Sequence, residues 1–195
     1  FPFTLEINGR RIFAKGSNFV SADIFYSKIT IDNYRSLCGL ALEANMNIFR
    51  MWGGSPVNKD EFFELCDKLG MMVWQEFPLS CNDYPDKPEK EAVSIVKRLK
   101  PHPCVVLWCG GNELFNGWSG MTNQSHALRL LDKVTFDFDR STPFIMTSPL
   151  YGVGHGPYVN IVDDKTGKEA ITLFRESPRT AYTEFGCPGP APLDY

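Results

Sequence analysis

Short apolar runs alternate with amphipathic helical patterns along most of this chain, and that alternation predicts the secondary structure. The expected strands cover residues 11–19, 46–52, 71–77, 105–108, 143–147 and 179–185. The expected helices cover residues 31–44, 58–69, 89–99, 126–139 and, more weakly, 169–176. The Gly-rich stretch 151–162 lacks either periodicity and is left unassigned.

Turn and cap residues set the limits of several of these elements. Asn8-Gly9 lies between alternating apolar and polar residues, which predicts a β-hairpin over about residues 1–14. Gly16 is expected near the end of the strand that follows. Asn58 is expected to cap the second helix and Gly70 to end it. The first helix is expected to bury an apolar face. That face comprises Ile31, Tyr34, Leu37, Cys38, Leu42 and Ala44.

The order of the elements indicates the fold class. Strand and helix alternate at least four times, a pattern typical of parallel strands with helical crossovers. The GSNFVSA segment does not match the GxGxxG turn of a dinucleotide-binding sheet. The predicted fold is therefore a (β/α)8 barrel. About seven strands are recognisable and a closed barrel usually takes about 250 residues, so we expect one partial barrel domain over residues 1–195, without its C-terminal unit.

Composition narrows the possible partners. The 195 residues are 43% hydrophobic, enough for a substantial core, and the net charge of −3 offers no basic field for nucleic acid. No apolar run approaches the length of about 18 residues that a membrane span requires, and the first residues do not resemble a signal peptide.

The cysteines and histidines predict no metal site. The six cysteines form no CxxC pair, and Cys38, Cys66 and Cys109 lie within apolar patterns, so we expect reduced thiols. The histidines are not at ligand spacing, and the chain has no phosphate loop. We therefore expect no cofactor.

The candidate chemistry lies at the ends of two expected strands. The run VVLWCGGNE, Val105–Glu113, turns at Gly110-Gly111 and then presents Asn112 and Glu113. Glu184 ends the last strand. Two carboxylates at the C-terminal ends of separate barrel strands can face each other, as glycoside cleavage requires.

Further polar and aromatic residues lie near the same strand ends. Arg50 would hold Glu184 ionised, because an adjacent cation lowers the pKa of a carboxyl group, and Asn112 would bond a sugar hydroxyl. Among the indoles, Trp52 is expected to contact sugar, whereas Trp74 and Trp108 lie inside strands and are expected in the core.

Five sequence blocks in order resemble glycoside hydrolase family 2, most closely its β-mannosidases. The blocks are NGRRIFAKGSNFVSAD, NIFRMWGG, FFELCDKLGMMVWQEF, HPCVVLWCGGNE and TEFG. The resemblance implies that Glu113 is the general acid/base and Glu184 the nucleophile of a retaining hydrolase of terminal β-D-mannosides. It also implies that full-length members carry β-sandwich domains before the barrel.

Departures from the family pattern leave the sugar open. This chain has WGGS and GGNE where β-mannosidases often have WGGG and GNNE. Between the fifth and seventh strands, His155 and Tyr158 are the best matches for sugar-contacting residues. The expected substrate-binding set is Asn18, Asp23, Arg50, Trp52, Asn112, His155 and Tyr158.

Two alternatives therefore remain. The substrate can be a β-galactoside, β-glucuronide or β-glucosaminide, since the shared motifs do not select the sugar. The chain can also be a carbohydrate-binding or structural module without turnover, in which case one of the two carboxylates would point away from the cleft. The expected partner is a carbohydrate; the oligomeric state is left open, and a periplasmic or secreted location is favoured over a cytoplasmic one.

Overall fold

The structure, a computed structural model, describes residues 3–84, 88–150, 152–159 and 161–186. Phe1 and Pro2 of the expected hairpin, Tyr151 and Cys187 lie outside these ranges. The helices are α1 (Ile31–Glu43), α2 (Asp60–Leu69), α3 (Glu89–Leu99), α4 (His126–Phe138) and α5 (Ala170–Glu176), with a 3-10 turn η1 (Tyr26–Lys28). None of the described helices is long and apolar enough to cross a bilayer.

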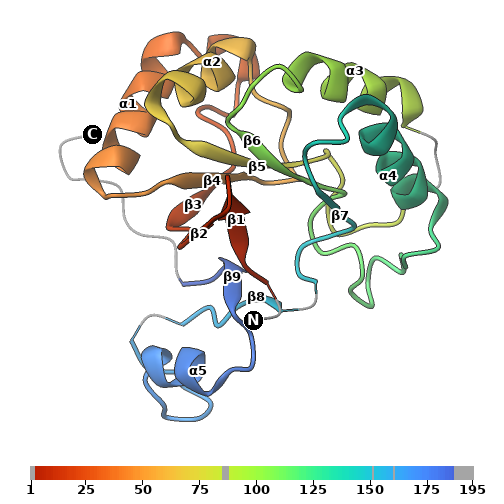
Figure 1. The fold of residues 1–195 in the computed structure, drawn as a ribbon. Helices are drawn as coiled ribbons and strands as arrows, with labels where there is room; N and C mark the ends of the chain where they lie inside the picture. The colour runs from red at the N-terminus through yellow and green to blue at the C-terminus, as the bar shows by residue number, and fades with distance from the viewer. Residues whose placement is uncertain (1–2, 85–87, 151, 160, 187–195) are drawn as a thin grey trace.

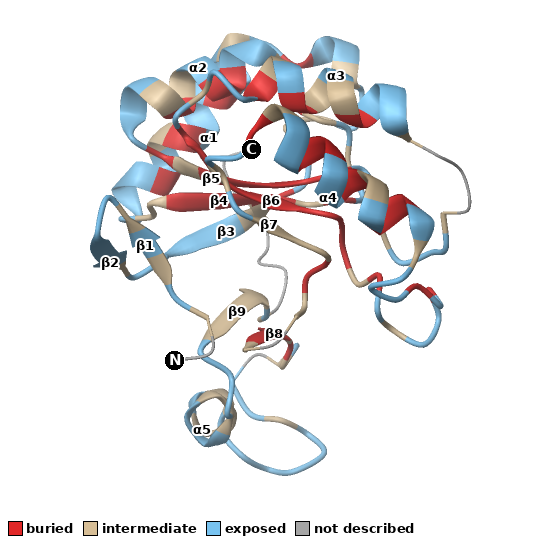
Figure 2. Ribbon diagram, turned by 45° about the vertical axis from the view of Figure 1, so that its right-hand side comes forward, coloured by how far each residue is buried: buried red, intermediate tan, exposed pale blue. Residues whose placement is uncertain are grey.

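A five-stranded parallel sheet forms the centre of the molecule (Figure 1). Its strands follow the chain order, each hydrogen-bonded to the next: β3 (Gly16–Phe19), β4 (Ile48–Met51), β5 (Met72–Glu76), β6 (Val105–Cys109) and β7 (Phe144–Ile145). Figures 1 and 2 both show α1 to α4 on one face of this sheet. Sequential parallel order with helices on a single face is the arrangement of a barrel wall, whereas a doubly wound sheet has helices on both faces.

Two further strands form a separate parallel pair, β8 (Val153–His155) and β9 (Ala181–Glu184). Seven strands thus follow the hairpin in the described residues, but they are divided between two sheets, and no continuous barrel is formed among them. Strand β8 lies in the stretch that the sequence left unassigned. The strand was not predicted because glycine occupies position 154 and interrupts the alternation of apolar and polar residues. Glycine is required there, since a Cβ would come within 2.4 Å of the Arg179 side chain.

The predicted strand over residues 11–19 is wrong as a single element. The chain pairs first as the hairpin β1 (Leu5–Ile7) and β2 (Arg10–Ile12), then bends and enters the parallel sheet at Gly16. The Asn47 side chain holds the bend, accepting from Lys15 N at 2.8 Å and donating to Phe13 O at 3.0 Å. Gly16 opens β3 because a Cβ there would lie 1.9 Å from Ile48 O.

Two helix predictions also need correction. Asn58 does not cap α2: its buried side chain accepts a bond from the Tyr34 hydroxyl at 3.2 Å and contacts Met51 Sδ, and Lys59 takes the N-cap position without a side-chain bond. In α1 the buried residues are Tyr34, Cys38 and Ala41. Leu37 and Leu42 lie beside that stripe and are exposed. Helix α1 begins after a capping box at Thr30, and Gly70 ends α2 in the left-handed conformation, as expected.

The core has two parts, one on each face of the large sheet. The larger part lies under α1 to α4. The smaller one consists of Ile48, Trp74, Leu107 and Cys109, and Phe3 and Leu5 from the N-terminal segment pack against it. The rings of Phe3 and Trp74 are 5.8 Å apart, so this segment covers the sheet face away from the helices. Trp74 and Trp108 are both buried, as predicted.

A buried carboxylate ties β6 to the end of α4. The Trp108 indole donates to Asp139 Oδ2 at 2.9 Å, and Ser141 donates to Oδ1 at 2.8 Å. Burial raises the pKa of Asp139, but these donors outweigh it and the pKa is lowered overall. Because the folded-state pKa is depressed, the stabilisation is present above the unfolded pKa of about 3.9 and is lost as the pH falls through the folded value.

We predict that Asp139→Ala lowers the free energy of unfolding at pH 7 by roughly 1.5–3 kcal/mol, because the buried indole N–H loses a charged acceptor. The difference from the unmodified protein should shrink as the pH falls below about 4. Urea unfolding at pH 7 and at acid pH measures both effects. The control is Asp137→Ala, which removes an exposed pair with Lys133 on the same helix and should cost less than about 1 kcal/mol. Equal losses in the two variants would contradict the prediction.

Candidate active site

The candidate site is built at the C-terminal ends of the parallel strands, where side chains from neighbouring strands converge. Asn18 on β3 pairs in register with Arg50 on β4, so their side chains share one face of the sheet. Glu76 ends β5, and Asn112 and Glu113 follow β6. Glu184 ends β9. Residues far apart in the chain therefore meet because each lies at or near the C-terminal end of a strand.

The Arg50 guanidinium is the central contact of this group. It is buried, with Nε 2.8 Å from Glu76 Oε1 and Nη1 3.0 Å from Glu184 Oε2. Nη1 also donates to Asn18 Oδ1 at 3.2 Å and Nη2 to Asn112 Oδ1 at 2.5 Å. Burial alone would lower the pKa of Arg50, but Glu76 and the other acceptors raise it, so the guanidinium stays charged. The expected Arg50–Glu184 contact is present in the structure.

Glu184 is held as an anion. Burial raises its pKa, but the bond from the Tyr158 hydroxyl to Oε1 at 2.9 Å, together with His155 and Arg50, lowers the pKa overall. The pKa of Tyr158 is raised by burial and by that same carboxylate, so its hydroxyl keeps the proton that it donates. At neutral pH the group at the end of β9 is therefore a carboxylate with both oxygens hydrogen-bonded.

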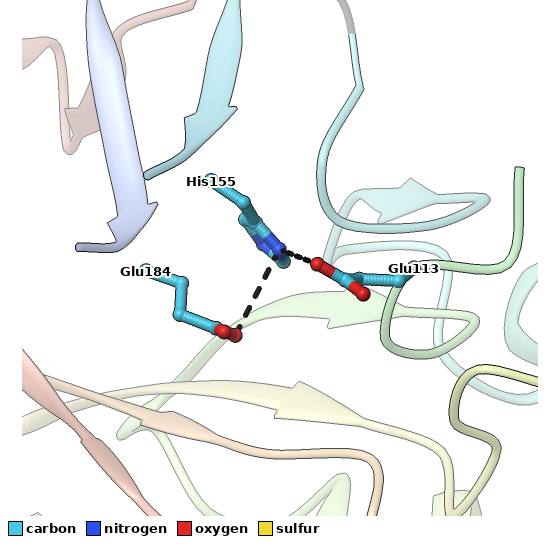
Figure 3. A group of neighbouring side chains, drawn as sticks. All are labelled: Glu113, His155 and Glu184. Carbon is cyan, nitrogen blue, oxygen red and sulfur yellow. Dashed lines mark hydrogen bonds and ion pairs between the residues drawn. The ribbon is translucent and has the colours of Figure 1, made fainter. Parts of the chain in front are cut away.

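Glu113 is held differently. Its backbone has a positive φ of 55°, uncommon for a residue other than glycine, and its N–H donates to Ser148 O at 2.7 Å. Its Oε1 lies 2.8 Å from His155 Nδ1 (Figure 3). Its Oε2 is 3.6 Å from the Cys81 thiol. Among the described residues, no lysine or arginine side chain is paired with Glu113.

His155 lies between the two carboxylates, as Figure 3 shows. Its Nδ1 is also 3.8 Å from Glu184 Oε2. Nε2 is 3.0 Å from Ser148 Oγ, which in turn is 2.7 Å from Thr183 Oγ1. Burial lowers the pKa of His155 and outweighs the Glu113 bond that raises it, so the ring is neutral at neutral pH. A neutral imidazole bonds a neighbour as donor or acceptor according to its tautomer.

Glu113, His155 and Glu184 each bring one ligand-type atom within 4.8 Å of the others, a grouping that the sequence did not predict. Oxygen and imidazole donors suit a divalent cation. However, His155 Nδ1 is already bonded to Glu113, and the Arg50 cation is 3.0 Å from Glu184. The positive charge of Arg50 supplies what a metal ion would supply to this carboxylate.

Among the described residues, no side-chain hydrogen bond or ion pair joins two of the predicted residues, Asp23 and Trp52, to this cluster. The Asp23 carboxylate accepts a bond from Phe25 N at 2.7 Å and thus closes a local turn. The Trp52 indole covers Gly54, where a Cβ would come within 2.1 Å of the ring. Trp118 is 67% exposed, away from the core.

Four residues of the cluster were not assigned to it from the sequence. Glu76 is the buried ion-pair partner of Arg50. The feature that could have identified Glu76 is its position at the end of a buried strand. Cys81, Ser148 and Thr183 join the cluster only through tertiary contacts, and no pattern in the sequence marks them.

Comparison with known proteins finds the same similarity that the five blocks indicate. No family model matches the chain. Beta-mannosidase from Capra hircus is 39% identical over 170 residues, which is 77% of this chain and 19% of that protein. Beta-mannosidase B from Aspergillus clavatus is 35% identical over 147 residues, 72% of this chain and 16% of that protein. The chain thus spans about a fifth of the length of the curated relatives it matches.

Solved structures agree with the sequence comparison. The crystal structure of Beta-D-Mannosidase from Dictyoglomus thermophilum superposes with a TM-score of 0.74 and 36% identity, over 80% of this chain and 22% of that one. A Parabacteroides merdae Beta-Glucuronidase has a TM-score of 0.61 at 18% identity, over 86% of this chain and 23% of that one, which shows a shared fold. The chain is therefore similar in sequence and in fold to one part of the β-mannosidases.

We predict that Glu76→Ala lowers the free energy of unfolding by about 3–5 kcal/mol, because it leaves the buried Arg50 without its nearest counter-charge. Chemical unfolding monitored by circular dichroism measures the loss. The matched control is Asp60→Ala, which removes the exposed ion pair with Arg98 and should cost less than about 1 kcal/mol. If Glu76→Ala lowered the free energy of unfolding by no more than the control does, the prediction would be wrong. Glu184 and the side-chain amides of Asn18 and Asn112 would then suffice to compensate the Arg50 charge.

Proposed function

We propose that this chain carries the catalytic residues of a retaining glycoside hydrolase that removes terminal β-D-mannosyl residues. The observation that carries the proposal is the opposition of two carboxylates with different environments. Oxygens of Glu113 and Glu184 come within 4.8 Å of each other. Retaining enzymes have carboxyl groups about 5–5.5 Å apart, whereas inverting enzymes separate them by roughly 6.5–9.5 Å.

The different environments of the two glutamates support different roles for them. Glu184, held ionised by Tyr158 and Arg50, is the nucleophile that attacks the anomeric carbon. Glu113, whose hydrogen-bond partners are the neutral His155 and Cys81, gives its proton to the glycosidic oxygen as the bond to the leaving group breaks. In the second step Glu113 takes a proton from water, the water oxygen bonds the anomeric carbon, and Glu184 leaves as a carboxylate.

The neighbouring residues support these roles. Arg50 fixes both Glu184 and the Asn112 amide, so the nucleophile and the proposed donor to a sugar hydroxyl share one anchor. The sheet of β3 to β7 and the β8–β9 pair are proposed to be parts of one (β/α)8 barrel, since strand order and one-sided helices fit its wall. A non-catalytic module would not require two carboxylates facing each other across one histidine.

The mannoside assignment rests on the β-mannosidase relatives and is tested by a panel of aryl β-glycosides on the full-length protein. We expect the highest kcat/KM with the β-mannoside. Preference for a galactoside, glucuronide or glucosaminide would overturn the sugar and leave the reaction in place. Absence of hydrolysis across the panel would overturn the reaction itself.

The two glutamates should separate by mutation. We predict that Glu184→Ala abolishes turnover of every substrate, because no glycosyl-enzyme can form. Glu113→Ala removes proton transfer, worth about 10²–10⁴-fold, so an activated phenyl mannoside should still form the covalent intermediate. Azide should then accelerate its breakdown and give β-mannosyl azide.

Steady-state kinetics and product analysis distinguish the two variants. Azide rescue of Glu184→Ala with retained configuration would reverse the assignment. Equal losses for good and poor leaving groups in Glu113→Ala would remove its role as the acid.

A further inference from the structure

Cys81 lies in the loop after β5, directly beside the candidate acid/base. Its backbone N–H donates to Asn112 O at 2.9 Å, which fixes the loop to the residue before Glu113. Its φ of 54° is in the left-handed region, a conformation that non-glycine residues rarely adopt. The Asn112 side-chain N–H lies 3.3 Å from Cys81 Sγ, and Sγ lies 3.6 Å from Glu113 Oε2.

The two oxygens of Glu113 therefore have separate partners. Oε1 is bonded to His155 at 2.8 Å, a short and partly buried contact. Oε2 has only the long thiol contact among the described residues. In the tautomer in which His155 Nδ1 carries the proton and donates to Oε1, Oε2 is the oxygen that holds the acidic proton of Glu113.

A thiol suits this position chemically. The S–H group is a weak donor and sulfur a weak acceptor, so Cys81 can accept from protonated Glu113 and donate to ionised Glu113. The 3.6 Å contact orients Oε2 without competing strongly with an incoming glycosidic oxygen. A hydroxyl would form a shorter and stronger bond to the same oxygen.

Cys81 is also exposed, whereas Cys38, Cys66, Cys104 and Cys109 are buried. The thiol in contact with Oε2 thus belongs to an exposed residue. A leaving group bonded through the glycosidic oxygen must approach Oε2 from the side of that residue, because the other carboxyl oxygen points to His155.

We infer that Cys81 is a positioning residue that holds Glu113 Oε2 toward the glycosidic oxygen and borders the space of the leaving group. This inference rests on the proposed function. It assigns Cys81 no bond to the sugar and no covalent step. Cys81 affects the rate of hydrolysis through Glu113. Its effect on the rate is therefore larger for leaving groups that depart only when protonated.

The test compares two mannosides in the full-length protein, one with a 2,4-dinitrophenyl leaving group and one with a methyl leaving group. For Cys81→Ala we expect kcat/KM to fall about tenfold with the methyl mannoside, a fraction of what the whole acid supplies, and to change less than about twofold with the activated one. Cys81→Ser, which keeps a donor and acceptor at this position, should recover part of the loss. Asn82→Ala is the matched control, since among the described residues the side chain of this exposed neighbour is bonded only to Asp83 N.

The outcomes separate cleanly. Equal losses for both mannosides in Cys81→Ala, or no loss for either, would overturn the positioning role while the proposed function stands. A serine variant as impaired as the alanine variant would also count against it. Failure of the unmodified full-length protein to hydrolyse the dinitrophenyl mannoside would overturn the proposed function and this role with it.

Discussion

A buried positive charge is the constraint on which the candidate site depends. Arg50 is 4% exposed and lies at the end of a strand that is buried along its whole length. An uncompensated charge there would cost several kcal/mol, so acceptors must surround it. They come from four other segments of the chain. These acceptors are Asn18, Glu76, Asn112 and Glu184. Satisfying one guanidinium thus fixes the relative positions of the groups proposed for catalysis.

The same constraint separates the two glutamates chemically. Glu184 shares the field of Arg50 and is ionised, whereas Glu113 is bonded to a neutral histidine and a thiol. The difference arises from which strand each carboxylate follows. Glu184 ends β9 opposite β4, and Glu113 turns away after Gly110-Gly111 with a positive φ. Backbone geometry, rather than the side-chain type, distinguishes the nucleophile from the acid in the proposed mechanism.

Local patterns predicted most of the elements but few of the contacts. The helix over residues 89–99 is confirmed to the residue, because its apolar spacing and Pro101 act within a few positions. Asn58 was misassigned since capping residues are also good partners for a buried hydroxyl, and Tyr34 lies 24 residues away. The pair Glu113 and Glu184 stood out as strand-end carboxylates. The positions of Cys81, Ser148 and Thr183 in the site could not be predicted in the same way. Their contacts join segments separated by 32 to 42 positions, or connect them to Glu113 indirectly through His155.

The bond between Arg50 and Glu184 joins positions 134 residues apart, and the Thr180 hydroxyl bonds both backbone polar groups of Phe3 across 177 residues. A contact of such long sequence separation requires closure of a large loop, and the entropy of that closure is lost before the contact stabilises it. A folding chain can therefore complete β3 to β7 and their helices while the nucleophile is still displaced. In that order of events, the five-stranded sheet is a scaffold without chemistry, and the arrival of β9 is the step that creates the two-carboxylate pair.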